Sequence, residues 1–429
     1  MIVWNEFLND ARVLKEAETL NAAGYDVIVH ALKIKREAVL NQTLESGISI
    51  TRVRHISPLV VIKNQLKRFL GILPSVKSSR PLSVSSKTDS GPIKKVSWRR
   101  RVILLTTRLL THFRLLVALL RSKPDVVHAH DVNTLPTAWL ASVLTRSKLV
   151  YDAHEISTDR EGYASFRNLV ARVEKFIMPR AALTMTTTDM RAKFFARAYG
   201  IQQPLVLQNR PRFSEVEASN RIRQELALKD DLPIVLYQGG IQQGRGLRRI
   251  VDAASLVTGA HFVFIGGGRL EQTLKDKVAE LELEEKVHFI PLVPLAELPS
   301  YTRSADIGVQ AIENTCLNHF STDSNKLFEY LIAGLPIVAT NMPEIRKIVE
   351  QYEFGHVVPE SDTNALAKAI QSLVDNPTER EKFAVNARQT AKILNWEAQE
   401  KLFVDAYKDV VDVDHISPSV EQSVEDTIS

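Results

Sequence analysis

Short apolar runs alternate with longer amphipathic segments along most of the chain. The runs are rich in Val, Ile and Leu, whereas segments such as 135–144 and 247–256 repeat apolar residues every three or four positions. The first pattern predicts buried strands, and the second predicts helices with one buried face. Strands that alternate with helices form parallel sheets. The predicted strands are 2–4, 25–31, 48–53, 125–129, 148–151, 183–187 and 205–207, then 234–237, 261–265, 287–290, 307–310 and 336–339.

These strands fall into two series, which predicts an α/β protein with two Rossmann-like doubly wound domains rather than one barrel. The chain of 429 residues is long enough for two domains. A strand ends and a charged helical stretch begins near residue 209, so we place the domains at 1–208 and 209–394. A last helix is expected at 395–410. The acidic tail at 411–429 is expected to be disordered.

Composition narrows the class of protein. Hydrophobic residues make up 45% of the chain and charged residues 24%, which is typical of a soluble globular protein. The single cysteine, Cys316, excludes an internal disulfide framework and fits a reducing, cytoplasmic compartment. The N-terminus continues directly into an amphipathic pattern that contains acids, so no signal peptide is expected.

Positive charge is concentrated in one segment. Residues 63–123 contain 15 Lys or Arg and a single acid, Asp89. Such a segment favours a polyanionic neighbour, which could be a membrane surface, a nucleic acid or an acidic substrate. A solvated loop is the alternative. We expect contact with the anionic inner face of a membrane, because the segment lacks the interleaved aromatic residues of a nucleic-acid stacking platform.

A nearly apolar stretch at 102–120 lies inside this basic segment. Its ionisable residues, Arg108, His112 and Arg114, argue against a membrane-spanning helix. Helical spacing predicts one apolar face packed on the protein core, with a membrane surface as the alternative. The residues of this predicted face are Val102, Leu105, Leu109, Phe113, Leu116 and Leu120.

Candidate chemistry in the second series lies where strands end. Ligands of open α/β sheets bind beyond the carboxyl ends of the strands. Gly239, Gly240 and then Arg245 follow one strand, and a glycine run that includes Gly267 follows the next. Glycine lets the backbone approach a ligand, and arginine can bind phosphate oxygens with two N–H groups. Pro294 follows the third strand and could flank a flat base.

The segment 321–340 adds a helix start to these loops. Ser324, Asn325 and Lys326 open an apolar helical pattern, and Glu329 lies one turn further on. Backbone N–H groups at a helix start attract phosphate, and a lysine adds charge. A carboxylate one turn away can accept hydrogen bonds from a ribose diol. Together with the preceding loops, this segment predicts a nucleotide site.

The first series carries different side chains at its strand ends. His128, His130 and Asp131 end one strand, and His154 and Glu155 end the next. Alternation along a strand sends His128 and His130 to one side of the sheet. These groups are suited to hydrogen bonds with a polar substrate. Zinc binding by the last four of them and simple capping of the following helices are the alternatives.

Taken together, these segments resemble the family 4 glycosyltransferases of the GT-B fold over nearly the whole chain. That family has two Rossmann-like domains that face each other across a cleft, and its last helix crosses back to the first domain. The resemblance places the acceptor on the N-terminal domain and the donor nucleotide on the C-terminal domain. The matching segments are DARVLKEAETLNAAGYDVIV, PDVVHAHD, YDAHE, YQGGIQQGRGL, FIGGG, VHFIPLVP and NKLFEYLIAGLPIVAT.

The resemblance also implies roles for individual residues. Glu329 matches the second glutamate of the family's E-x7-E motif, which binds the donor ribose. Arg245 stands where the phosphate-binding lysine is expected, and His154 resembles the histidine that contacts the transferred sugar. Two positions depart from the family: Ser321 replaces the first glutamate, and Gly240 replaces an arginine. The implied catalytic residues are Arg245, His154 and Lys326, and the implied donor-binding residues are Gly239, Gly240, Gly267, Pro294, Ser324, Asn325, Lys326 and Glu329.

The implied activity is retaining transfer of a sugar from a UDP- or GDP-linked donor to a glycan or a lipid-linked acceptor. The resemblance implies no metal and no cofactor besides the donor. A nucleotide-sugar epimerase or a phosphorylase of the same two-domain architecture is the alternative within the enzyme class. A basic nucleic-acid-binding protein is the alternative from another class.

Overall fold

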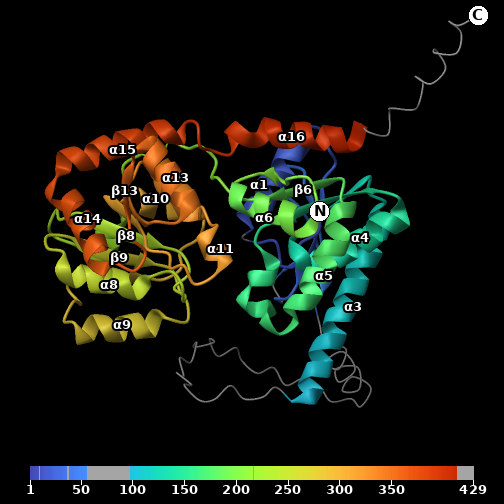
Figure 1. Ribbon diagram of the computed structural model, residues 1–429, viewed down its shortest axis with the longest axis horizontal. Helices are drawn as coiled ribbons and strands as arrows, with labels where there is room; N and C mark the ends of the chain where they lie inside the picture. The colour runs from blue at the N-terminus through green and yellow to red at the C-terminus, as the bar shows by residue number, and fades with distance from the viewer. Residues whose placement is uncertain (9, 36–37, 56–96, 216, 413–429) are drawn as a thin grey trace, which may run out of the picture.

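The computed structural model describes residues 1–8, 10–35, 38–55, 97–215 and 217–412. Two α/β lobes lie side by side and are bridged along one edge by the end of the chain (Figure 1). Residues up to Leu207 build the N-terminal lobe, and the C-terminal lobe begins after the linker that follows it. The predicted fold class, two Rossmann-like α/β lobes, is therefore confirmed.

The N-terminal lobe contains a mostly parallel sheet. Ile2 lies in the middle of this sheet, where it bridges His30 on one side and Ala129 on the other. The predicted first strand is therefore reduced to a single bridged residue. The strand order is β2-β3-β1, then Ile2, then β4-β5-β6-β7. The strands are β1 (Ile28–Lys33), β2 (Asn41–Thr43), β3 (Ser49–Arg54), β4 (Val126–His130), β5 (Lys148–Ala153), β6 (Leu183–Thr186) and β7 (Leu205–Val206).

Helices cover both faces of this sheet, and each begins where its sequence allows it to. Asp10 caps the first helix by accepting a hydrogen bond from the Val13 N–H, and Thr188 caps another through the Arg191 N–H. The helices are α1 (Ala11–Ala22), α3 (Trp98–Ser122), α4 (Asp131–Thr145), α5 (Arg167–Ile177) and α6 (Asp189–Tyr199). The 3₁₀ turns η1 (Ser157–Asp159), η2 (Glu161–Phe166) and η3 (Met178–Arg180) lie around α5.

The C-terminal lobe has a fully parallel sheet in the order β10-β9-β8-β11-β12-β13. This is the doubly wound order, in which the chain reverses direction beside β8 and leaves a crevice there for a ligand. The strands are β8 (Ile234–Gln238), β9 (His261–Ile265), β10 (Val287–Ile290), β11 (Ile307–Gln310), β12 (Ile337–Thr340) and β13 (Gly355–Val358). The helices are α7 (Arg221–Leu226), α8 (Leu247–Leu256), α9 (Glu271–Glu280), α10 (Leu298–Thr302), α11 (Leu317–Phe320), α12 (Asn325–Ala333), α13 (Pro343–Tyr352), α14 (Thr363–Asp375) and α15 (Pro377–Ala391).

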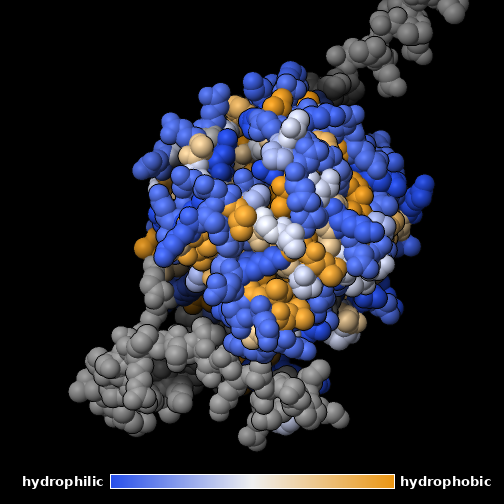
Figure 2. Space-filling view, turned by 90° about the vertical axis from the view of Figure 1, so that its left-hand side faces the viewer, coloured by the Kyte–Doolittle hydropathy of each residue, from blue (hydrophilic) through white to orange (hydrophobic). Residues whose placement is uncertain are grey.

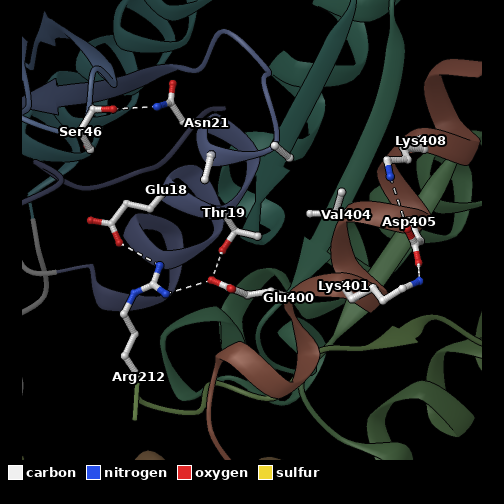
Figure 3. Close-up of a pocket in the computed structure, with 12 residues that line it drawn as sticks. Glu18, Thr19, Asn21, Ser46, Arg212, Glu400, Lys401, Val404, Asp405 and Lys408 are labelled. Carbon is white, nitrogen blue, oxygen red and sulfur yellow. Dashed lines mark hydrogen bonds and ion pairs between the residues drawn. The ribbon is translucent and has the colours of Figure 1, made fainter. Parts of the chain in front are cut away.

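The last helix, α16 (Glu397–Asp412), leaves the C-terminal lobe and packs on the N-terminal one (Figure 1). Trp396, Phe403 and Tyr407 are buried in the same hydrophobic core as α1 and β1. A shallow groove lies where α1, α16 and the linker that follows β7 meet. There Arg212 lies between Glu18 and Glu400, at 3.2 Å and 2.9 Å (Figure 3).

Nearly all predicted strands are present, with ends shifted by a few residues. Two strands were missed. β2 is a short exposed strand of polar residues, and β13 begins with Gly355, so neither has a clear apolar run. The last helix extends to Asp412, so the first two residues of the predicted disordered tail are helical. The rest of that tail, 413–429, and residues 56–96 of the basic segment lie outside the described residues.

The predicted orientation of α3 is wrong over its first half. Thr107, Thr111, Leu115 and Leu119 form the buried stripe, whereas the apolar side chains predicted to face the core are 48 to 61% exposed from Val102 to Phe113. The two threonine hydroxyls donate to carbonyl groups one turn earlier in the helix, at 2.7 and 2.8 Å. Small side chains that satisfy their own hydroxyls can pack closely, so hydropathy alone chose the wrong face.

Candidate functional site

The loops that follow β8, β9 and β10 form one connected layer in the C-terminal lobe. The Gly239 N–H donates to the carbonyl of Ile265 at 2.8 Å, and the Gly266 N–H donates to the carbonyl of Ile290 at 3.0 Å. A Cβ atom at Gly266 would lie 2.1 Å from the Gly239 carbonyl oxygen. At this position glycine serves the packing of loop on loop, in addition to any approach of a ligand.

The start of α12 lies against this layer. Lys326 is buried, with Nζ 5.2 Å from the centre of the Tyr237 ring and 3.0 Å from the position that a Cβ of Gly239 would take. Burial, and then the nearby Arg245 guanidinium, lower the pKa of Lys326 to about 8. A bound anion would relieve both effects. The predicted Gly239, Lys326 and Arg245 are therefore gathered in one place.

Ser324 has an unusual backbone, with φ 55° and ψ 131°, and its side chain makes no capping hydrogen bond to α12. A non-glycine residue in this region of φ carries strain of about 1 to 3 kcal/mol. Ser324 therefore does not act as an ordinary side-chain N-cap of α12. Strain at a helix start is a common mark of a ligand site.

Glu329 borders a pocket of 340 Å³ between the lobes. One carboxylate oxygen of Glu329 accepts a hydrogen bond from Gln238 at 2.6 Å, and Gln238 in turn accepts one from Thr302 at 2.7 Å. Asn325 lines the same pocket, as do apolar residues after β10 and Lys15 from α1 of the other lobe. A carboxylate held in one orientation beside an apolar pocket suits a ribose with its attached base.

Three other residues that were predicted to bind the nucleotide-sugar donor do not line the Glu329 pocket. Gly240 is exposed, and its carbonyl accepts a hydrogen bond from the Tyr237 hydroxyl at 2.8 Å. The Pro294 carbonyl accepts from the N–H groups of Glu297 and Leu298, so Pro294 shapes the turn that leads into α10. A Cβ atom at Gly267 would meet only the Glu271 side chain, at 3.9 Å, which leaves space above the Gly267 backbone.

In the N-terminal lobe, His154 lies beside the contact with the C-terminal lobe, and its side chain is 20% exposed. His154 Nε2 lies 2.8 Å from Asp152 Oδ2, and Nδ1 lies 3.7 Å from Asp131 Oδ2. Burial lowers the pKa of His154, but the two carboxylates outweigh burial and raise it to about 9. The ring is therefore an imidazolium at neutral pH. Asp131 has a strained backbone with φ 62°, at the first residue of α4.

A buried group of polar side chains lies behind His154. Glu16, His128, His130 and Asp152 have ligand atoms within 4.8 Å of one another, and among the described residues no other such group of three or more is found. Arg12 already supplies the positive charge here, with Nε 2.7 Å from Asp152 and 3.1 Å from Glu16. A divalent ion would compete with this guanidinium, so the donor set does not fit a metal.

The four side chains considered for zinc on sequence grounds are not brought together as such a group. His130 stacks on His128 with ring centres 4.2 Å apart. Glu155 points to Arg160, at 3.7 Å. His128 is buried and pairs with the hydroxyl of Tyr407 on α16 at 2.6 Å, so it serves the core rather than a substrate.

The lobes meet directly beside His154. Arg191 of α6 donates to the carbonyl of His154 at 2.7 Å, to the carbonyl of Asn318 at 3.1 Å and to the hydroxyl of Ser321 at 3.2 Å. Ser321, which stands at the family's first glutamate position, is buried in this contact. The position is used here to join the lobes.

Sequence reasoning missed several of these residues. Asp152 and His154 are two residues apart at the end of a strand, a spacing that places them on one side of the sheet. Arg12 and Glu16 are four residues apart on a predicted helix, where charged groups fall among the apolar ones. Those two spacings were the available signals. Gln238 and Arg191 gave none, because their roles depend on contacts between distant segments.

Comparisons with known proteins identify the family and the fold of this chain. The family described as Glycosyl transferases group 1 matches residues 218–390, and the family described as Glycosyl transferase 4-like domain matches residues 10–209. A phosphatidyl-myo-inositol mannosyltransferase from Mycobacterium leprae is 23% identical over 293 residues, which are 67% of this chain and 74% of that protein.

Solved structures show the same fold. Sucrose-phosphate synthase from Thermosynechococcus elongatus has a TM-score of 0.70 at 18% identity and covers 94% of this chain and 93% of its own. Anabaena Alr3699/HepE, solved in complex with UDP-glucose, has a TM-score of 0.68 at 14% identity. The match covers 95% of this chain and 98% of the Anabaena chain. With the two family matches lying end to end over most of its length, the chain belongs to the family 4 type of GT-B glycosyltransferases.

Proposed function

We propose that this glycosyltransferase moves a sugar, with retention of configuration and without a metal, from a nucleotide-diphosphate sugar to a glycan or a lipid-linked acceptor. The observation that carries this proposal is the grouping of Lys326, Arg245 and the strained start of α12 next to the Glu329 pocket. Cationic groups and the N–H groups of a helix start suit a diphosphate, and a fixed carboxylate beside an apolar pocket suits a ribose.

The chemical difficulty in this reaction is the departure of an anionic diphosphate. The bond between the anomeric carbon and the β-phosphate oxygen breaks while the acceptor oxygen bonds to the same carbon. Lys326 and Arg245 would stabilise the charge that develops on the leaving group, in a site where burial strengthens their effect. These two cations take the place of the divalent ion that other transferases use.

Retention follows if the acceptor attacks from the same face as the leaving group. Asp152, a fully buried carboxylate of the N-terminal lobe, is held by Arg12 and His154, which argues against its acting as a nucleophile. We therefore favour front-face attack, in which an oxygen of the departing phosphate takes the acceptor proton.

Names of relatives support the substrate classes. Anabaena Alr3699/HepE was solved with UDP-glucose, and a trehalose-6-phosphate protein from E. coli was solved with UDP-2-fluoro glucose. These make UDP-sugars the first donors to test, and GDP-sugars the second. The Mycobacterium leprae relative is named for a phosphatidyl-inositol acceptor, which supports a lipid-linked acceptor for this chain.

Contact with an anionic membrane is part of this proposal. Arg100–Ser122 is, among the described residues, the one helix long and apolar enough to cross a membrane. Leu115 and Leu119 pack in the core of the lobe, which a spanning helix could not do at the same time. The first half of α3 instead exposes apolar side chains beside Arg100 and Arg101, which favours a helix lying at the membrane surface.

The experiment is a thermal-shift screen against UDP-, GDP- and ADP-sugars, because selective binding raises apparent stability. The selected donor is then incubated with candidate acceptors in EDTA, and the anomeric configuration of the product is read by NMR. We expect free nucleotide to appear only when an acceptor is present, with a retained anomeric centre. An inverted product or a loss of turnover in EDTA would contradict the proposal. Conversion of the donor sugar without an acceptor would indicate an epimerase.

A further inference from the structure

His154 lies between two carboxylates that approach its two ring nitrogens. Asp152, which is 0% exposed, accepts at Nε2, and Asp131, which is 25% exposed, lies beyond Nδ1 on the more exposed side of the ring. A neutral imidazole carries one hydrogen, so it would leave one nitrogen lone pair facing a negative oxygen. A ring with hydrogen on both nitrogens suits both neighbours.

Asp152 is itself fixed and fully buried. Arg12 donates from Nε to Oδ2 at 2.7 Å and from Nη2 to Oδ1 at 2.8 Å, a bidentate pair. The remaining Arg12 nitrogen donates to the carbonyl of Leu207 at 2.6 Å. Arg12 therefore ties the carboxylate to α1 and to the end of β7, and Asp152 cannot turn away from His154.

Burial and the Arg12 guanidinium both lower the pKa of His154, but the carboxylates of Asp131 and Asp152 outweigh them and favour a protonated ring. Burial raises the pKa of Asp152, but Arg12 and then His154 hold it well below its usual range, so Asp152 is ionised. Burial lowers the pKa of His130, whose Nδ1 lies 3.4 Å from His154 Nε2, so that ring is neutral. Burial, and then Asp152, raise the pKa of Glu16 to about 8, so Glu16 is uncharged at pH 7.

We propose that Asp152, clamped by Arg12, is a positioning residue that holds the His154 ring with hydrogen on both nitrogens and directs the Nδ1–H toward the cleft. This inference rests on the proposed function for its chemical meaning, since it concerns the same cleft. An imidazolium has no lone pair, so His154 acts as a cationic hydrogen-bond donor to a substrate oxygen and does not accept the acceptor proton. That proton is left to the departing phosphate.

The direct test is an NMR titration of the histidine side-chain nitrogens of the full chain, with His154→Gln to assign the signal. We expect both nitrogens of His154 to be protonated at pH 7.5, with a titration midpoint near 9 in the wild-type protein. Asp152→Asn removes the negative charge and should lower this midpoint by at least one pH unit. A neutral His154 at pH 7.5 in the wild type would overturn the proposal even if Asp152→Asn fails to fold.

The matched control is Glu174→Gln. Glu174 is another fully buried carboxyl group of the same lobe, and it accepts hydrogen bonds from the hydroxyls of Tyr151 and Tyr199 at 2.7 and 2.8 Å. This variant should leave the His154 midpoint in place. An equal shift in both variants would mean that Asp152 acts only through the stability of the lobe, and that result would also overturn the proposal.

A kinetic measurement connects the titration to turnover. The pH profile of kcat for the wild type should fall on the alkaline side near pH 9, and Asp152→Asn should move that fall by at least one unit toward acid. An unchanged profile would sink the assignment of His154 as the cationic donor. Because the NMR titration needs no turnover, failure of the proposed transferase activity leaves that test standing.

Discussion

The two faces of the cleft are built in different ways. On the C-terminal face, backbone groups of neighbouring loops hold one another, and one buried lysine and one fixed carboxylate complete the site. On the N-terminal face, the partly exposed His154 depends on Asp152 and Arg12, a buried ion pair behind it. The first arrangement is made within one lobe. The second joins residues that are 140 positions apart, Arg12 and Asp152, and 279 apart, His128 and Tyr407.

This difference indicates what each face contributes. A site built of backbone is the same whatever its neighbours do, and it suits the constant part of a donor, its diphosphate and ribose. A site built of buried charges responds to changes in packing. It fixes the orientation of one side chain but leaves the shape around it to the adjoining loops.

The largest effect on turnover should come from removing positive charge from the C-terminal face. Arg245→Ala should lower kcat about 100-fold or more, by analogy with the loss of one donor to a developing anion. The control is Arg248→Ala, which removes an exposed arginine of α8 three residues away. Steady-state kinetics with saturating donor make the measurement. Near-normal turnover in Arg245→Ala would show that this face does not work through that cation.

The second prediction concerns the close packing of the loop after β9 against the loop after β8. Gly266→Ala places a methyl group 2.1 Å from the Gly239 carbonyl oxygen and should lower the free energy of unfolding by about 2 to 3 kcal/mol. Gly267→Ala, one residue later, meets nothing closer than 3.9 Å and should leave stability almost unchanged. Denaturant unfolding of both variants decides. Equal stability would contradict the packing role of Gly266.

The third prediction concerns the pocket beside Glu329, where we propose that the donor ribose binds. Glu329→Gln keeps the shape of the side chain but removes its charge, and loss of a charged hydrogen bond to a diol costs about 1.5 kcal/mol. The donor Kd should therefore rise about 10-fold, with little change for inorganic diphosphate, which does not carry a ribose. Calorimetric titration with both ligands separates the two cases. An equal loss of affinity for both ligands would contradict a contact between Glu329 and the ribose.

The smallest effect is expected on the outer surface of the N-terminal lobe. Replacing Leu105 and Leu109 of α3 by serine should weaken binding to anionic vesicles about 5-fold, because each is more than half exposed and contributes apolar area. Leu256 and Leu402 are exposed to a similar degree and form the control pair. Figure 2 shows the end of the C-terminal lobe, where hydrophobic residues are scattered among hydrophilic ones. Equal vesicle binding by both pairs of variants in a flotation assay would contradict membrane contact through α3.

Sequence reasoning succeeded where structure is local. Two lobes of parallel strands, the glycine loops and the helix start at Asn325 follow from periodicity and turn chemistry, since each depends on residues close in the chain. It failed for α3, where buried threonines replaced the expected leucines. It also could not find the partners of His154, because a buried arginine looks like a surface arginine until the helices are packed. The roles assigned to individual site residues stay predictions until variants are measured.

The return of α16 to the first lobe has a consequence for how the protein is made. Trp396, Phe403, Tyr407 and Val410 complete a core whose other buried residues all lie at or before Leu207. During synthesis the N-terminal lobe emerges first, yet its last core residues leave the ribosome only after the whole C-terminal lobe. The C-terminal lobe can therefore finish folding before the N-terminal lobe. The contact between His128 and Tyr407 forms only after α16 has been synthesised. Emergence of α16, rather than emergence of the strands of the N-terminal lobe, then sets the moment at which this lobe is complete.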